Sequence, residues 1–188
     1  MTEEPDPQRL VRVLAFALRH HPLQFGVGLD GEGFADLDEF VVGIRFSHYD
    51  WATLNREQVE DAIRGTDPGR FEIRAGLVRA RYGHSVPLGS PGEQRTPPEF
   101  LLHGTSADAL ATVLATGLRP MNRAFVHLTS DPDYAAQVVT AKGGGEVIRI
   151  RAKEAGDAGV AFFRANPHVW LCRSVAPEFL SRLPAQSA

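Results

Sequence analysis

The sequence predicts an α+β protein built from two lobes. In its first half, one stretch has apolar residues at helical spacing, two capping-box patterns open further helices, and a β-hairpin pattern follows them. In its second half, short strand patterns surround a small number of helical ones. Between the halves, residues 86–98 are rich in glycine, proline and serine, a composition typical of a linker. The predicted domains are therefore 1–85 and 99–188, joined by 86–98.

The first lobe is predicted to contain three helices and a hairpin. Apolar residues in 10–18 recur at helical spacing, and Pro22 ends that helix. Residues 36–44 and 55–64 each begin with a capping-box pattern, Asp36 with Glu39 and Asn55 with Gln58. Two strand patterns in 70–82 flank Ala75-Gly76 and predict the hairpin.

Helices followed by a hairpin are typical of a winged-helix-like lobe, a frequent nucleic-acid-binding design. Four arginines lie in the predicted hairpin against a single acid, Glu72: Arg70, Arg74, Arg79 and Arg81. This predicts a local basic patch, although the chain as a whole has a net charge of −3.

The second lobe is predicted to consist of short strands with two helices. The helices cover 107–115 and about 131–139, the latter opened by Ser130 or Asp131. The strands are expected at 100–103, from Arg123 to Thr129, and at 146–151, 160–163 and 169–172.

Bulk properties exclude several classes of protein. Cys172 is the only cysteine, which rules out an internal disulfide and a thiolate zinc cluster and fits a reducing cytoplasm. No apolar run approaches the ~20 residues of a membrane span, and the acidic residues 1–8 do not resemble a signal peptide. Only two of the 20 basic residues are lysines, and arginine is the better bidentate phosphate ligand.

Two strand ends carry polar groups that suit an anionic ligand. After Arg123, side chains alternate so that Phe125, His127 and Thr129 share one face. The other strand ends in the triplet His103-Gly104-Thr105, whose glycine allows close approach to the backbone. A metal site is not expected, because no carboxylate or third histidine has suitable spacing.

Two further candidates have an ordinary structural interpretation when taken alone. Arg19 and His20 end the first helix, where cations interact favourably with the helix dipole. Arg70 could be a solvated arginine of the hairpin. Phosphate-loop, dinucleotide and nucleophile-elbow motifs are missing, so spacing alone predicts an arginine- and histidine-lined site without a familiar nucleotide loop.

Taken in order, these segments resemble the RNA 2′-phosphotransferase family. The matching pieces span about residues 10–180 and are Leu18-Arg19-His20, Leu29-Asp30 with Gly33-Phe34, Arg70-Phe71, Ile73-Arg74-Ala75, Gly83-His84-Ser85, His103-Gly104-Thr105, Pro120-Met121-Asn122-Arg123, Val126-His127-Leu128 and Asn166 with Val169-Trp170-Leu171. The departures are Val11 and Ala15 for serines, Tyr82 for glutamine, Thr129 for serine, and Thr140-Ala141-Lys142 for a Gly-x-Arg.

The resemblance implies an N-terminal winged-helix-like RNA lobe and a C-terminal ADP-ribosyltransferase-like lobe that binds NAD⁺ as co-substrate. The implied reaction, known from tRNA splicing, removes an internal RNA 2′-phosphate and gives nicotinamide, RNA with a 2′-OH and ADP-ribose 1″,2″-cyclic phosphate. The implied catalytic residues are Arg19, His20, Arg70 and Arg123, and the implied NAD⁺-binding residues are His103, Gly104, Thr105, His127 and Thr129. The resemblance calls for no metal, and a cytoplasmic monomer is expected.

Two alternatives remain open at the level of sequence. The altered segment Thr140–Lys142 leaves room for NAD-dependent ADP-ribosylation of nucleic-acid phosphate ends. The hairpin arginines would also suit a non-catalytic RNA-binding module, although that hypothesis explains neither Arg123 nor the two histidine-bearing strands.

Overall fold

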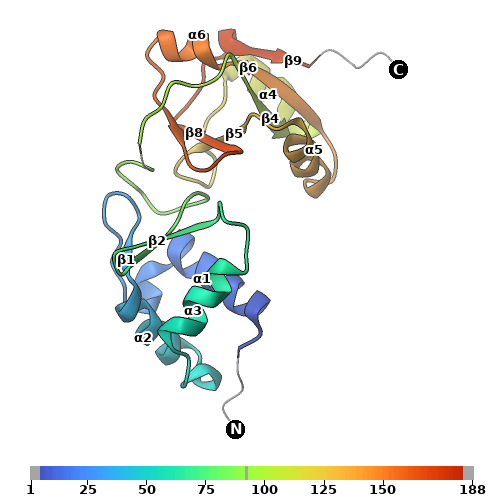
Figure 1. The fold of residues 1–188 in the computed structure, drawn as a ribbon. Helices are drawn as coiled ribbons and strands as arrows, with labels where there is room; N and C mark the ends of the chain where they lie inside the picture. Colours follow the sequence, from blue (N-terminus) through green and yellow to red (C-terminus); the bar gives the residue numbers. More distant parts are fainter. Residues whose placement is uncertain (1–4, 92, 184–188) are drawn as a thin grey trace. The chain divides into compact units, whose positions relative to one another are not determined.

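The computed structural model describes residues 5–91 and 93–183. Two compact units make up the chain, with the boundary after Pro91. Each unit has its own antiparallel sheet (Figure 1). Each also has its own buried apolar core. The architecture is therefore mixed, with six α-helices and two sheets among the described residues, which confirms the predicted α+β class at this level.

The first unit contains three α-helices and a small sheet. Its elements are α1 (Pro7–His20), η1 (Pro22–Phe25), β1 (Ala35–Asp36), α2 (Leu37–Ser47), η2 (Tyr49–Trp51), α3 (Arg56–Arg64), β2 (Phe71–Arg74) and β3 (Leu77–Ala80). The strands pair antiparallel in the order β1-β3-β2. Apolar faces of the three helices meet the sheet in one core, which includes Leu14, Phe40 and Val78.

Local signals explain most of these boundaries. The Asn55 side chain accepts from the Gln58 N–H, and the Gln58 side chain accepts from the Asn55 N–H, so the predicted capping box at α3 is confirmed. The hairpin turn is also confirmed. Ala75 and Gly76 have φ angles of 51° and 82°, as a type I′ turn requires at both central positions.

The predicted basic patch on the hairpin is wrong in part, because two acids, Glu32 and Glu72, offset part of its charge. Arg79 is only 9% exposed and donates to Glu72 at 2.7 Å, with Glu32 at 3.6 Å. Arg81 lies 3.5 Å from Glu72, and Arg74 lies 3.8 Å from Glu32. Burying a guanidinium without a partner would be costly, so Arg79 and Glu72 are best explained as a structural pair.

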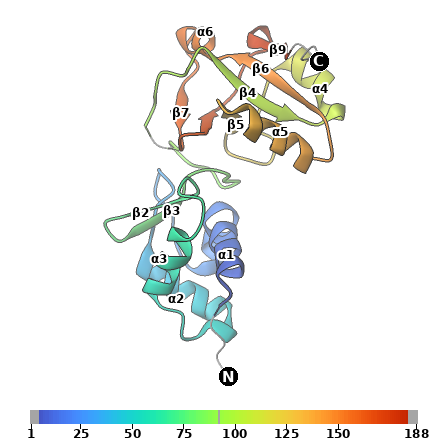
Figure 2. The same cartoon turned by 45° about the vertical axis from the view of Figure 1, so that its right-hand side comes forward.

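The second unit is built on a six-stranded antiparallel sheet in the order β7-β8-β5-β4-β6-β9 (Figure 2). The strands are β4 (Phe100–Thr105), β5 (Val126–Thr129), β6 (Glu146–Arg151), β7 (Phe162–Arg164), β8 (Val169–Cys172) and β9 (Leu180–Arg182). The helical elements are α4 (Ala107–Thr116), α5 (Pro132–Ala141), α6 (Ala152–Asp157) and η3 (Pro177–Phe179). α5 packs on β4, and the sheet buries residues such as Leu101, Leu128 and Ile148.

Several elements differ from the sequence prediction. β5 begins at Val126, so Arg123 lies in an irregular loop rather than at the start of a strand. β1 has two residues and β9 has three, and both were missed because such short segments show no clear periodicity. α6 was missed for the same reason, since it has only six residues. Among the described residues, no helix is long and apolar enough to cross a membrane.

Candidate functional site

Arg19 and His20 are fixed by a loop that is distant in sequence. The loop Gly83–Ser85 follows β3 and lies against the end of α1. The Ser85 N–H donates to the Arg19 carbonyl at 2.9 Å, and the Ser85 hydroxyl lies 2.9 Å from His20 Nδ1. These two contacts set both the backbone and the imidazole of this pair. The structural interpretation of Arg19-His20 as a simple helix end is therefore incomplete, because a second segment orients both residues.

Gly83 and Tyr82 form a close wall around the Arg19 side chain. Gly83 has a φ of 91°, and a Cβ atom there would lie 3.3 Å from Arg19 Cδ and Nε. The Tyr82 ring lies 5.0 Å from the Arg19 guanidinium carbon, within cation–π range. The departure from glutamine at position 82 thus gives Arg19 an aromatic face. Both contacts reduce the freedom of the guanidinium before any ligand binds.

His84 is a buried neutral imidazole behind this loop. His84 is only 4% exposed. Burial and, to a smaller extent, the nearby charges of Arg19, His20 and Arg79 lower its pKa to about 4. His84 Nε2 has no hydrogen-bond partner among the described residues and lies against Gly33. At neutral pH this group therefore adds no charge to the site.

Arg70 belongs to the same unit and precedes β2. Its N–H donates to the Asp67 carbonyl at 2.9 Å, and its guanidinium carbon lies 5.9 Å from the Phe71 ring. The side chain is half-buried, and it forms no ion pair with any described residue. Unlike the neighbouring hairpin arginines, Arg70 therefore keeps its charge available for an anion.

In the second unit, His103 closes a split between two strands. β4 and β5 pair at one position, Leu102 with Thr129. Beside it, the His103 Nδ1 atom lies 2.8 Å from the carbonyl oxygen of His127 on β5. A carbonyl can only accept, so Nδ1 carries the proton. Burial lowers the pKa of His103; the hydrogen bond to the His127 carbonyl opposes this shift, and the charges of Lys142 and Arg123 add to it. The ring is therefore neutral at pH 7, and Nε2 is an acceptor.

Lys142 is a cation of this site that the sequence prediction did not include. Its Nζ donates to the Gly104 carbonyl at 2.7 Å, and burial lowers its pKa, followed by the charge of Arg123. Gly104 makes this possible, because a Cβ there would lie 3.0 Å from the Ala135 carbonyl and from Val139. Only glycine lets α5 approach β4 so closely. The signal that could have revealed Lys142 was the departure at 140–142.

The two predicted threonines are both buried. Thr105 and Thr129 are each 3% exposed. The Thr129 hydroxyl accepts from the Asp131 N–H at 3.0 Å, and Asp131 in turn caps α5. Thr129 therefore has a visible structural role, and its hydroxyl keeps its hydrogen and one lone pair for a ligand. No observation assigns a comparable role to Thr105.

Arg123 is exposed in the loop before β5 and has no ion pair among the described residues. The predicted residues therefore form two groups. Arg19, His20 and Arg70 lie in the first unit, and the others lie in the second, where Arg123 and Lys142 influence His103 electrostatically. No group of three potential metal ligands occurs in the described parts of the chain.

Comparison with known proteins gives one consistent result. The family model "RNA 2′-phosphotransferase, Tpt1 / KptA family" matches residues 5–174. A probable RNA 2′-phosphotransferase of Acetivibrio thermocellus is 34% identical over 93% of this chain and 96% of that protein. Proteins with the same description from Burkholderia lata and Thermococcus kodakarensis are 38% and 32% identical, over 95% of this chain in both cases and over 92% and 98% of their own lengths.

Proposed function

Because this chain belongs to the RNA 2′-phosphotransferase family, we propose that it transfers an internal RNA 2′-phosphate to NAD⁺. The reaction releases nicotinamide and ADP-ribose 1″,2″-cyclic phosphate and leaves a 2′-OH on the RNA. The observation that supports this most directly is the fixed arrangement of Arg19 and His20, held by Ser85 and bordered by Gly83.

The first step needs little acid–base chemistry from the protein. An oxygen of the RNA 2′-phosphate attacks C1″ of the nicotinamide ribose as nicotinamide leaves, and this oxygen is already anionic. The protein must therefore position the phosphate, and guanidinium forks suit that task. Arg19 and Arg70 are the donors in the first unit, and the contacts of Arg19 with Tyr82 and Gly83 restrict it before binding.

In the second step the ribose O2″ attacks phosphorus and the RNA 2′-oxygen leaves, taking up a proton. Negative charge then builds on the phosphoryl and leaving oxygens, and fixed cationic donors stabilise it. We assign this stabilisation to Arg19, Arg70 and Arg123. His20, whose Nδ1 faces Ser85, either holds the phosphate or helps to deliver the proton.

The second unit has groups that fit NAD⁺. His103 Nε2 is an acceptor, as a ribose hydroxyl requires, and its orientation is fixed through Nδ1. Lys142 supplies positive charge near it, which suits a pyrophosphate. Gly104, Thr105, His127 and Thr129 complete the proposed NAD⁺-binding set on β4 and β5.

The fold of each unit supports the same division of labour. Three helices and a hairpin, with sheet order β1-β3-β2, fit a winged-helix-like RNA lobe. A six-stranded antiparallel sheet with a split between β4 and β5 fits an ADP-ribosyltransferase-like NAD⁺ lobe.

The test uses an RNA oligonucleotide with one internal 2′-phosphate, incubated with the enzyme and NAD⁺. We expect one nicotinamide released for each 2′-phosphate lost, and a product mass that matches ADP-ribose cyclic phosphate. The same oligonucleotide without the 2′-phosphate is the control and should release none. Intact 2′-phosphate after prolonged incubation would refute the proposal.

A second candidate reaction is ADP-ribosylation of nucleic-acid phosphate ends, with NAD⁺ as donor. The observation that favours it is Lys142, which stands in the altered segment 140–142 and lies near His103 and Arg123. A terminally phosphorylated RNA or DNA that gains the mass of one ADP-ribose would support this activity. A terminal phosphate that stays unmodified while internal 2′-phosphates are removed would argue against it.

A further inference from the structure

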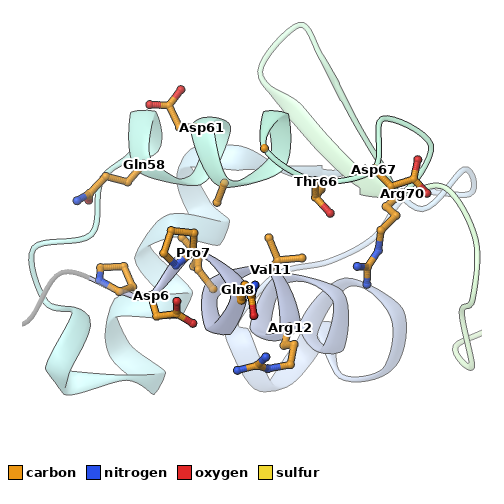
Figure 3. A pocket seen from close by; sticks show the side chains of 14 residues that line it. Asp6, Pro7, Gln8, Val11, Arg12, Gln58, Asp61, Thr66, Asp67 and Arg70 are labelled. Carbon is orange, nitrogen blue, oxygen red and sulfur yellow. The ribbon is translucent and has the colours of Figure 1, made fainter.

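A cavity in the first unit lies between α1, α3 and the segment that leads into β2. It has a volume of about 1050 Å³ and is lined by residues of all three segments, including Arg12 and Arg70 (Figure 3). The family chemistry gives a role to Arg70 but none to the rest of this cavity. Its size exceeds what a single phosphate group needs, so it has room for a neighbouring nucleotide.

Arg12 and Arg70 differ from the other arginines that surround them. Among the described residues of the first unit, Arg9, Arg56 and Arg64 form ion pairs with acids, whereas no ion pair involves Arg12 or Arg70. In Figure 3, Arg12 projects from α1 and the Arg70 side chain extends toward α1. Two arginines without acidic ion-pair partners among the described residues thus belong to the lining of one cavity.

Among the described residues, no acid of the cavity forms an ion pair with either of these arginines. Asp6 caps α1 through the Arg9 N–H at 2.7 Å, Asp61 pairs with Arg64 at 2.7 Å, and Asp67 accepts from the Gly69 N–H at 2.9 Å. Figure 3 shows the carboxylates of Asp61 and Asp67 pointing away from α1. In the described part of the chain, neither Arg12 nor Arg70 is therefore offset by a direct ion pair within the cavity, so each guanidinium can still pair with a phosphate.

Helix geometry extends this surface toward the proposed phosphate site. Gln8, Arg12, Ala15 and Arg19 follow spacings of four, three and four residues, so they lie on one face of α1. Seven residues separate Arg12 from Arg19, which corresponds to about 10 Å along the helix axis. One phosphate cannot occupy both positions, so Arg12 would contact a different phosphate from the one that Arg19 holds.

We propose that Arg12 binds a backbone phosphodiester of single-stranded RNA, next to the 2′-phosphorylated nucleotide. The base and ribose of that nucleotide would lie in or beside this cavity. This inference rests on the proposed function of Arg19 and Arg70. Arg12 extends recognition from the 2′-phosphate to the strand that carries it. The ligand class is a flexible RNA strand, because an exposed guanidinium on a helix reads backbone charge rather than base sequence.

The experiment compares two substrates with wild-type enzyme and the variant Arg12→Ala. One substrate is a 2′-phosphorylated oligonucleotide with several nucleotides on each side, and the other is a nucleoside 2′-phosphate with no phosphodiester. We expect kcat/KM for the oligonucleotide to fall about tenfold through KM, and the value for the nucleoside 2′-phosphate to stay at the wild-type level. An equal loss on both substrates would overturn the proposal.

The salt dependence of RNA binding is a second measurement, and it would not change if Arg12 had only a structural role. Each lost phosphate contact should lower the slope of log Kd against log salt by about 0.7 for a single strand. Binding of the oligonucleotide is measured by fluorescence anisotropy at several salt concentrations. Arg12→Lys should keep the wild-type slope. Arg12→Ala should show a slope lower by about 0.7, the value expected for the loss of one phosphate contact. An unchanged slope in Arg12→Ala would also overturn the proposal.

The matched control is Arg56→Ala, which removes an exposed arginine of the same unit that pairs with Asp38 and Glu60. It should leave both readouts at wild-type values. Failure of the proposed function shows separately, as a wild-type enzyme that turns over neither substrate. In that case the anisotropy series still decides whether Arg12 contacts the RNA backbone.

Discussion

The two units hold their candidate residues by different means. In the first unit a side chain and a short loop, Ser85 and Gly83, fix Arg19 and His20. In the second unit backbone carbonyls do so, with His127 holding His103 and Gly104 holding Lys142. The first unit therefore presents permanent guanidinium charges in restricted positions, whereas the second combines a neutral imidazole with a partly buried amine. Such a difference fits one unit that binds a phosphate and another that binds a nucleotide with hydroxyl groups.

The largest effect on turnover should come from Arg123, which lies in the second unit but is proposed to act on the RNA 2′-phosphate. Arg123→Ala is expected to lower turnover by about 10²–10³-fold, because a fixed donor to developing negative charge is lost. Steady-state nicotinamide release measures turnover, and RNA binding should fall only modestly. Arg119→Ala, which removes a nearby exposed arginine, is the control. Unchanged turnover in Arg123→Ala would break the assignment of Arg123.

The next effect concerns stability and pH in the first unit. The unfolded chain protonates position 84 near pH 6.5, whereas the folded chain protonates it only near the lowered pKa of about 4. The contribution of neutral His84 is therefore fully present above pH 6.5 and is lost as the pH falls toward about 4, by up to about 3 kcal/mol.

Urea unfolding at a series of pH values between 7 and 4 measures this contribution. His84→Asn should flatten the decline in unfolding free energy that the wild type shows. His21→Asn, which removes an exposed imidazole, should keep the wild-type decline. An identical pH dependence in wild type and His84→Asn would show that His84 is not the responsible group. His103, whose pKa is also lowered, contributes in the same direction in both proteins.

The loop that borders Arg19 can be tested with a pair of glycines. Gly83→Ala and Gly76→Ala both place a side chain at positive φ, so each should cost about 1 kcal/mol or more of stability. Only Gly83→Ala adds a contact to Arg19, whereas a Cβ at Gly76 meets nothing within 4 Å. We expect turnover to fall 10- to 100-fold in Gly83→Ala alone. Equal turnover in the two variants would remove the positioning role of Gly83.

The smallest effect should come from Lys142 in the second unit. Lys142→Ala is expected to raise KM for NAD⁺ about three- to tenfold, because one charged donor is lost. KM for RNA should change little, which separates this residue from the first unit. Lys142→Arg should restore most of the affinity, and Lys153→Ala, which removes a lysine paired with Asp157, should have no effect. A rise in KM for RNA alone would move Lys142 to the phosphate side.

The accuracy of the sequence prediction depended on how local each signal was. The capping box of Asn55 and Gln58 and the turn at Ala75-Gly76 were predictable, because each is decided by residues within a few positions. The charge of the hairpin was not predictable in this way. Arg79 pairs with Glu72 on the adjacent strand and also approaches Glu32, which is 47 positions away.

By itself, the sequence determined the α+β class, most helices and strands and, through the order of its motifs, the family, from which the site residues are proposed. Only the tertiary structure decided how those residues are held. His20 meets Ser85 across 65 positions, and Lys142 meets Gly104 across 38. It also decided which arginines are neutralised and which, such as Arg12 and Arg70, are not. The physical reason is that periodicity and capping act over one or two turns of chain, whereas charge pairing and pKa depend on neighbours that only folding brings together.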